Sequence, residues 1–567
     1  MRAAIVFMCI LIGSINSFGD DLTVTVRERR TDDVIPGALI QIGPAPGDPF
    51  PGNVVYSDAG GTATLSDPAL TAGLPLSVSA FGFAAITVFD CPVGVVTVWC
   101  DPVSRVDWAD TSLISGTVSN LPIINNDGFL DLAIVFSGAS LAQLVTFNWD
   151  LISPYTDPMP TPAGDVEIPE NIDIPSQIEL LFVTFQKEPY TRREETGSII
   201  DLLCLGYRIS LEDLVAGEIT NLDPTRATAT RDYSVSGDAV VNHTCTLNSI
   251  ADLDVSVSGL PIAEISGIVS VGELTSSGRP NRFFPEHAAF ISSDTSVTLE
   301  RIPQTGVFVD LATYAGVMYA DTSGGLSFGG GAFDWTPVTA NDSRVFNAFY
   351  SPPELLRIDD SFSWWGYQTA GTPAADYVFG TFSLDDRSGA DHDTLAWEIV
   401  SPATHGTVTM PTLPADAPHW STLPDPGITA NEDQLVWSCF VVSSPADLDM
   451  FLRSPLADGE LFSFKSGDAP QLTGPTDFTI AVSGDTDPVL AWSSEQFSEW
   501  YAIRWYPAPW DPYGGEFLTQ DTEYTDIGGL PTVGSQRYYR LSSRGGISQS
   551  PWSVPLGATS WELDDGP

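Results

Sequence analysis

The chain has 567 residues and a formal net charge of −50 at pH 7, because 73 acidic residues stand against 23 basic ones. A surface this acidic repels phosphate backbones and anionic lipid headgroups, so we expect neither a nucleic-acid partner nor a role at a membrane surface. A hydrophobic content of 43% argues against disorder, and 49 glycines with 44 prolines indicate many turns. At about 150 residues per domain, the length predicts three or four domains.

The first 19 residues have the pattern of a secretory signal peptide. A positive charge at Arg2 precedes an apolar run over residues 3–12, and small residues such as Ser17 and Gly19 follow it. The apolar run is about half of the ~20 residues that a membrane-spanning helix needs, and no later segment is long and apolar enough. We therefore expect a secreted or periplasmic protein without a transmembrane segment.

Residues 20–106 contain short alternating apolar runs separated by turn residues, which predicts a compact β-sandwich. The most characteristic pieces are IPGA at 35–38, SDAGG at 57–61 and SAFGF at 79–83. In these pieces the stretch resembles the carboxypeptidase regulatory-like domain, a transthyretin-like β-sandwich of secreted and periplasmic bacterial proteins. The resemblance implies a folding or interaction module without catalytic residues.

Five cysteines remain once the signal peptide is removed. Cys91 and Cys100 have eight residues between them and close the first domain, so we predict a disulfide between these two. Cys204 and Cys245 are a second candidate pair, which would leave Cys439 free. Spacing alone does not decide that second pairing, and the chain has no C-x-x-C pair that would indicate zinc or redox chemistry.

The middle of the chain, residues 107–350 and 351–467, is β-rich and resembles no family. Segments such as LDLAIVFSG, QIELLFVTFQ and ISGIVSVGEL are strand-like, and Gly, Pro, Asn and Asp separate them. We expect one or two sandwiches in the first range and a single β-rich domain in the second.

Residues 468–567 contain an ordered series of aromatic strands. Trp492 is followed by WYAIRW at 500–505 and RYYRL at 537–541. This order resembles a fibronectin type III-like domain, which implies a spacer or binding module whose aromatic residues fill a sandwich core. The chain as a whole is therefore predicted to be all-β, with several β-sandwich domains in tandem.

Motifs for enzyme chemistry are few. GLSFG at 325–329 matches the G-x-S-x-G nucleophile elbow, but the following GGAFDW cannot open the helix that an elbow requires, which favours a glycine-rich β-turn. The five histidines lack the spacing of a zinc hydrolase. No catalytic residue is predicted.

Two acidic loops are candidate calcium sites. Calcium takes six to eight oxygen ligands, which Asp and Asn side chains and turn carbonyls supply. A solvated turn explains the same residues in a β protein. The candidate ligands are Asn125, Asp127 and Asp131 in the first loop and Asp385, Asp391 and Asp393 in the second.

Trp364, Trp365 and Tyr367, in the segment SFSWWGYQ, are candidate carbohydrate-binding residues. Aromatic faces pack on the apolar faces of sugar rings, although a sandwich core would use the same residues. Paired carboxylates for glycoside hydrolysis cannot be located, because their diagnostic separation is spatial.

Three functions are compatible with the sequence. The favoured one is a secreted β-sandwich protein with a non-catalytic structural or binding role at or outside the bacterial cell surface, with a glycan or a cell-surface protein as partner. The second is a secreted polysaccharide or ester hydrolase with its site in the middle region. The third is a calcium-dependent adhesin. Clustered carboxylates in one concave groove would support the second.

Overall fold

The computed structural model describes residues 21–559 apart from several gaps. The longest gaps are 102–110, 137–189, 211–220, 275–282, 387–395, 419–432 and 454–459, and gaps of one to four residues interrupt the rest. The predicted signal peptide at 1–19 lies outside the described residues. Regular structure in the described part is almost entirely β-strand, which confirms the all-β class. The helical elements there are α7 (Leu448–Arg453) and the 3-10 turns η1 (Gly306–Phe308) and η2 (Ala403–His405).

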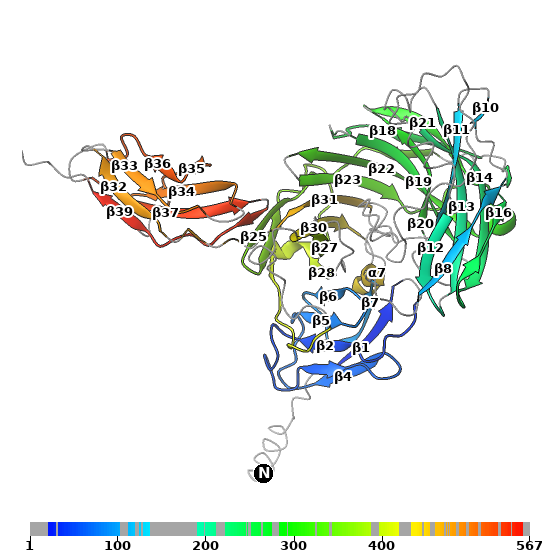
Figure 1. Cartoon of the computed structure of the whole chain (residues 1–567), viewed down its shortest axis with the longest axis horizontal. Helices are drawn as coiled ribbons and strands as arrows, with labels where there is room; N and C mark the ends of the chain where they lie inside the picture. Colours follow the sequence, from blue (N-terminus) through cyan, green and yellow to red (C-terminus); the bar gives the residue numbers. More distant parts are fainter. Residues whose placement is uncertain are drawn as a thin grey trace, which may run out of the picture.

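Residues 21–101 form a sandwich of two small sheets beside the N-terminus (Figure 1). In one sheet, β1 (Asp21–Glu28) lies between β4 (Thr62–Ser66) and β7 (Gly94–Cys100). The other has the order β3 (Val54–Tyr56), β2 (Leu39–Ile42), β5 (Leu76–Ser79) and β6 (Ala85–Val88). Every second side chain of β1 is buried, because successive residues of a strand point to opposite faces. Val24 and Val26 thus meet Ile40 and Val78 in one core.

The second of these sheets continues into the middle of the chain. β6 pairs in parallel with β28 (Ala396–Pro402), where Ala85 lies opposite Trp397 and Val88 opposite Val400. From β28 the sheet runs through β27 (Tyr377–Asp386), β30 (Asp433–Ser443), β31 (Leu461–Asp468), β23 (Leu326–Asp334), β22 (Leu311–Ser323) and β19 (Ile265–Leu274). It ends through β20 (Phe283–Phe290), β14 (Asn221–Ser234), β13 (Ile199–Ser210), β11 (Phe129–Phe136) and β10 (Ile124–Asn125), with β17 (Thr246–Leu247) beside β14.

This long sheet has 17 strands and curves through most of the molecule outside the C-terminal sandwich (Figure 1). Strands from the ranges 20–106, 107–350 and 351–467 share it, an arrangement that the sequence does not indicate. The predicted domain bounds stay a prediction.

Three smaller sheets accompany the middle part of the long sheet. β8 (Thr111–Gly116) lies between β12 (Tyr190–Glu195) and β15 (Ala239–Val240), and β9 (Val118–Ser119) pairs with β16 (His243–Thr244). β18 (Ala251–Val257) lies between β21 (Thr295–Arg301) and β24 (Ser343–Phe346), which leaves β24 at an edge. Leu253 and Val255 of β18 pack with Ile268 and Val317 of the long sheet in one core.

The C-terminal sandwich is joined to the middle of the chain through a shared sheet. β25 (Glu354–Ile358), β26 (Ser361–Trp365) and β29 (Thr407–Thr409) continue through β38 (Ser548–Gln549) into the C-terminal strands. Arg357 stabilises the junction: its side chain is buried and donates hydrogen bonds to the carbonyls of Ala469 and Asp359.

The C-terminal sandwich packs a three-stranded sheet on a four-stranded one. β32 (Thr479–Ser483), β33 (Asp487–Ala491) and β36 (Glu523–Thr525) face β35 (Gly515–Thr519), β34 (Trp500–Tyr506), β37 (Gln536–Gly545) and β39 (Leu556–Thr559). Leu490, Trp492, Tyr501 and Tyr539 lie in its core. This is the fibronectin type III-like fold expected for this range.

Within the described residues, no helix has both the length and the apolar character that a membrane crossing requires.

Candidate functional site

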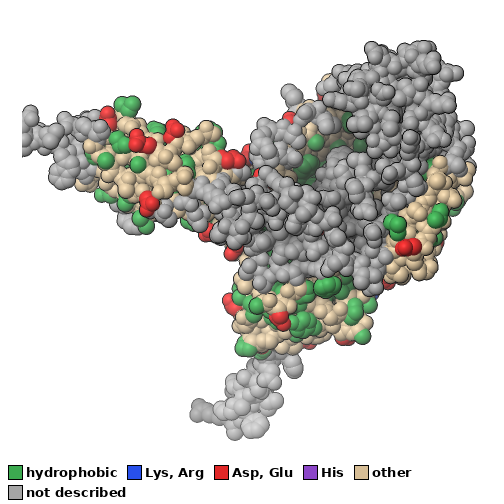
Figure 2. Space-filling model, viewed as in Figure 1, with side chains coloured by type: hydrophobic (Ala, Val, Ile, Leu, Met, Phe, Trp, Pro, Cys, Tyr) green, Lys and Arg blue, Asp and Glu red, His purple; other side chains and the backbone are tan. Residues whose placement is uncertain are grey.

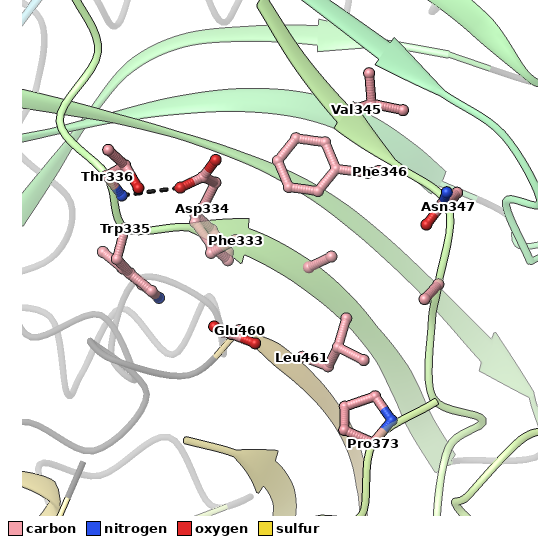
Figure 3. A pocket seen from close by; sticks show the side chains of 12 residues that line it. Phe333, Asp334, Trp335, Thr336, Val345, Phe346, Asn347, Pro373, Glu460 and Leu461 are labelled. Carbon is pink, nitrogen blue, oxygen red and sulfur yellow. Dashed lines mark hydrogen bonds between the residues drawn. The ribbon is translucent and has the colours of Figure 1, made fainter. Parts of the chain in front are cut away.

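An open groove of about 600 Å³ lies where the end of β23 meets the start of β31 and the edge strand β24 (Figure 3). We call it the Trp335 groove. Four separate parts of the sequence line it: residues 332–336, residues 345–348, Pro373, and Glu460 with Leu461. The Phe333 amide donates a hydrogen bond of 2.9 Å to the Glu460 carbonyl, which fixes the end of β23 against the start of β31.

Glycines in β23 allow its close approach to the neighbouring strand β22. A Cβ atom on Gly329 would lie 2.2 Å from the Tyr319 carbonyl oxygen, and one on Gly331 would lie 2.3 Å from that of Val317. Only glycine tolerates such contacts. Leu326 to Gly329 of the GLSFG motif lie in strand β23 and are not followed by the helix of a nucleophile elbow. The glycine-rich segment is therefore a strand where the sequence predicts a turn, and Gly325 lies outside the described residues.

Aromatic rings form the floor of the groove. Phe333 and Trp335 are stacked, with ring centroids 5.2 Å apart and an interplanar angle of 15°. Tyr314 and Phe283 pack against Trp335 from below, with centroids 5.1 Å and 5.7 Å away. Phe333 is buried while Trp335 is half-buried, so part of the Trp335 side chain is exposed at the groove that it lines.

Polar groups form the rim. Asp334 accepts a hydrogen bond of 2.9 Å from the Thr336 amide and pairs with Arg344, whose Nε lies 3.2 Å from Asp334 Oδ2. Arg344 also donates to the Thr336 carbonyl. Glu460 and Asn347, which also line the groove, are exposed (Figure 3). The lining of the groove thus includes aromatic rings together with carboxylate and amide groups, which bind hydroxyl groups well.

The aromatic residues predicted for sugar binding are not part of this groove. Trp364 is 1% exposed in the main core and donates its indole N–H to the Ala403 carbonyl, 3.2 Å away. Trp365, the next residue of β26, points to the opposite face and is 48% exposed. Tyr367 is half-buried, with its ring edge-on to Tyr350. Trp364 is therefore too buried to contact a sugar, and it lies on the opposite face of β26 from Trp365. Sugar binding by Trp365 and Tyr367 stays a prediction.

The predicted calcium ligands are described only in part. Asn125 ends β10, Asp131 lies in β11 opposite Arg208, and Asp385 lies in β27 opposite Gln434. Asp127, Asp391 and Asp393 lie outside the described residues. Within the part of the chain that the structure describes, no three His, Cys, Asp or Glu side chains gather in a way that would hold a metal ion. Calcium stays a prediction.

The predicted disulfide between Cys91 and Cys100 does not form. Both are buried free thiols, and burial raises the pKa of Cys91 to about 12. The extended strand β7 places the Cα atoms of Gly94 and Cys100 about 20 Å apart. The three residues from Cys91 to Gly94 span at most about 10 Å, so the Cα atoms of Cys91 and Cys100 are at least about 10 Å apart. Bridged Cα atoms must lie within about 7 Å. Cys439 is also a buried free thiol, and Cys204 is buried. Cys245 lies outside the described residues, so its pairing with Cys204 stays a prediction.

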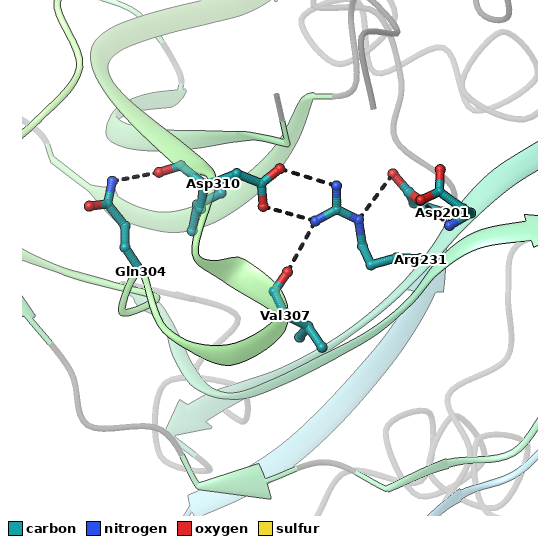
Figure 4. A network of polar contacts seen from close by, with 7 residues as sticks. Asp201, Arg231, Gln304, Val307 and Asp310 are labelled. Carbon is teal, nitrogen blue, oxygen red and sulfur yellow. Dashed lines mark hydrogen bonds and ion pairs between the residues drawn. The ribbon is translucent and has the colours of Figure 1, made fainter. Parts of the chain in front are cut away.

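Two arginines, of which Arg29 is buried and Arg231 half-buried, join strands and do not line the Trp335 groove. Arg231 pairs with Asp310 through two contacts of 3.0 and 3.2 Å, and Asp201 lies 3.5 Å from its Nε (Figure 4). Arg29 pairs with Asp101 and, at 3.0 Å, with Glu398 of β28. Burial raises the pKa of Glu398 to about 8, an effect that the Arg29 charge opposes. These pairs hold strands together.

Acidic side chains are spread over the described parts of the face in Figure 2. The long-range field of the molecule therefore disfavours anionic ligands in the Trp335 groove, where Asp334 and Glu460 add two further carboxylates.

No protein-family model matches this chain, and no curated protein matches it either. Among solved structures, a two-domain fibronectin type III segment of chicken tenascin is 11% identical and covers 38% of this chain and all of its own length, with a TM-score of 0.16. The FN1–FN3 domains of chicken CNTN1 are 11% identical and cover 60% of this chain and 95% of their own, with a TM-score of 0.20. A β-1,2-glucanase from Parabacteroides distasonis is 14% identical and covers 45% of this chain and 33% of its own, with a TM-score of 0.15. The fold of this chain is therefore defined by its own strand pairings and not by these similarities.

Proposed function

We propose that this chain is an exported protein that binds a neutral polysaccharide outside the cell, in the Trp335 groove. The observation that carries the proposal is the rigid Phe333 and Trp335 stack at the floor of an open cavity with a polar rim. Aromatic faces pack on sugar rings, and carboxylate and amide groups bind the surrounding hydroxyl groups.

Charge selects the class of glycan. Asp334 and Glu460 line the groove, and the molecule carries a formal charge of −50, so a polymer rich in carboxylates or sulfates is repelled from this site. A neutral chain such as a glucan, xylan or mannan meets no such repulsion.

Export is supported by the signal-peptide pattern of the first 19 residues. The pieces IPGA, SDAGG and SAFGF support a non-catalytic module of the carboxypeptidase regulatory-like kind at residues 21–101. This module shares the long sheet with the groove-bearing region through the pairing of β6 with β28.

Replacing the accessible indole tests the proposal. We expect Trp335→Ala to weaken binding of the preferred neutral polysaccharide by about tenfold, because the stacking area is lost. Migration in gels that contain a β-glucan, xylan or mannan identifies the ligand, and calorimetry with its oligosaccharides gives the affinity. Asn347→Ala, at the exposed rim, is a second variant that leaves the aromatic floor intact.

Trp365→Ala is the matched control, since Trp365 is an exposed tryptophan outside the groove. It should bind as the unchanged protein does. The proposal fails if no neutral polysaccharide binds, or if Trp365→Ala loses binding while Trp335→Ala and Asn347→Ala keep it.

A second candidate function is hydrolysis of the bound polysaccharide, because two carboxylates, Asp334 and Glu460, line the same groove. Glycosidases use such a pair as acid and as base or nucleophile. In this case the unchanged protein releases reducing ends from the polysaccharide, and Glu460→Gln stops the release while binding persists. A protein that binds without releasing reducing ends has the binding role alone.

A further inference from the structure

The C-terminal sandwich presents a cationic and aromatic face. Tyr501, Ile503, Tyr539 and Leu541 point into the sandwich core, so the alternate residues of β34 and β37 lie on the outer face of the sheet. We call this the arginine face. It presents Arg504, Arg540 and Arg544 together with Glu516, Trp500 and Tyr513.

Arg504 is held in place on both sides. Its guanidinium carbon lies 4.6 Å from the ring centre of Tyr513 and 4.3 Å from that of Trp552. Its Nε lies 2.6 Å from Glu516. The same carboxylate accepts a hydrogen bond of 2.9 Å from Arg544. One acidic group therefore serves two arginines, and their positions are fixed before any ligand arrives.

Arg540 is the unbalanced charge of the face. It lies directly opposite Arg504 in the pairing of β34 with β37, and like charges in opposite positions destabilise a sheet. Among the described residues no ion pair involves Arg540, and its buried Nε has no hydrogen-bond partner. The guanidinium carbon of Arg540 lies 6.0 Å from the Tyr506 ring centre. An anion between the two arginines would relieve this repulsion.

The surroundings make this arrangement unusual for the molecule. The whole chain has 23 basic residues against 73 acidic ones, yet the arginine face has three arginines and one glutamate. Apolar groups accompany the charges: Trp500 is 42% exposed, Tyr513 52% and Leu518 54%. Exposed rings beside guanidinium groups suit a ligand that has both flat apolar faces and carboxylates.

We infer that the arginine face docks an acidic polysaccharide, with the carboxylates of uronic-acid sugars between Arg540 and Arg504 and a sugar ring on Trp500. Charge complementarity selects an anionic occupant, and the exposed rings favour a sugar over an acidic peptide. The site is separate from the Trp335 groove, so either proposal can fail alone.

Polygalacturonate, which has a carboxylate on every sugar, is the probe. We expect the full chain to bind it at least tenfold more tightly than fully methyl-esterified polygalacturonate, which has the same backbone without the charge. Arg540→Gln should weaken binding about tenfold, and Arg540→Lys should restore part of it, because lysine keeps the charge and loses the planar fork. Trp500→Ala should weaken polygalacturonate binding without affecting binding of poly-glutamate.

Arg27→Gln is the matched control, since it removes one positive charge from a partly exposed position on β1. It should leave polygalacturonate binding unchanged, and Arg540→Gln should leave the melting temperature and neutral-polysaccharide binding unchanged. Three outcomes would overturn the inference: no binding of polygalacturonate, equal binding of the esterified polymer, or tighter binding of poly-glutamate, which would assign the face to an acidic protein segment.

Discussion

Glu286 is a buried carboxyl group in the middle of the long sheet. In the pairing of β19 with β20, His287 lies opposite Ser270 and Pro285 opposite Val271, so Glu286 is the extra residue of a β-bulge. Its Oε1 accepts a hydrogen bond of 2.9 Å from the Ile302 amide. Burial raises the pKa of Glu286 to about 7, and the Thr313 hydroxyl, the Ile302 amide and Arg301 oppose the rise only in part. The folded protein therefore favours the neutral carboxyl.

This raised pKa predicts a pH dependence of stability. Below the ordinary pKa near 4.5 both states bind the proton, and between 4.5 and about 7 the folded state binds more protons than the unfolded one. Stability should thus fall as the pH rises from 5 to 8, by up to about 3 kcal/mol from this group. Glu286→Gln should lose that part of the slope in urea unfolding at pH 5, 6, 7 and 8.

The result to compare is the pH dependence of the unfolding free energy in Glu286→Gln and in the unchanged protein. The difference between them isolates Glu286, since burial also raises the pKa of Glu398 to about 8. Glu523→Gln, at an exposed position of β36, should retain the slope of the unchanged protein. If the unfolding free energies of Glu286→Gln and the unchanged protein change in parallel with pH, the raised pKa of Glu286 is contradicted.

At the scale of single elements, the sequence predicts what is local. Alternating residues such as Val24 and Val26 in β1 identify strands, because burial of one face has a period of two. The same rule separates Trp364 from Trp365, but adjacent aromatics do not reveal which of the two is buried. Pairing between distant strands is invisible to such patterns. The Trp335 groove is lined by residues 332–336 and 460–461, which only the pairing of β23 with β31 brings together.

The junction of the first sandwich with β28 depends on Arg29. Its side chain is 1% exposed and lies between Asp101 and Glu398, which come from the two sides of the junction. We expect Arg29→Met to destabilise the protein by about 3–5 kcal/mol, because it leaves carboxyl groups buried without their counter-charge. Chemical unfolding measures the loss.

Arg27→Met is the control from the same segment. Arg27 pairs with Asp32 at 3.6 Å near the surface, and such pairs contribute less than about 1 kcal/mol. Equal losses of unfolding free energy in Arg29→Met and Arg27→Met would show that the buried pair contributes no more to the junction than a surface pair does.

At the scale of the whole molecule, the charge of −50 makes cations the natural partners. If the loops with Asp127 and Asp391 hold calcium, added calcium should raise the melting temperature by several degrees and excess chelator should reverse the rise. Any salt screens the repulsion between exposed charges that lie more than ~8 Å apart at physiological ionic strength. Potassium chloride at equal ionic strength is therefore the control. The double change Asp127→Asn with Asp131→Asn should remove part of the calcium effect. An equal rise of the melting temperature with potassium chloride would show that calcium acts only by screening charge.

The parallel pair of β6 and β28 links the fold to the order of synthesis. Ala85 finds its partner Trp397 more than 300 residues later in the chain. At about 5–20 residues per second, the first sandwich would wait some tens of seconds with the edge of β6 uncovered. An uncovered edge strand is a template for pairing with other chains. During this interval the growing chain has to be kept from aggregating, and a protein held unfolded until it is exported would form both partners at the same time.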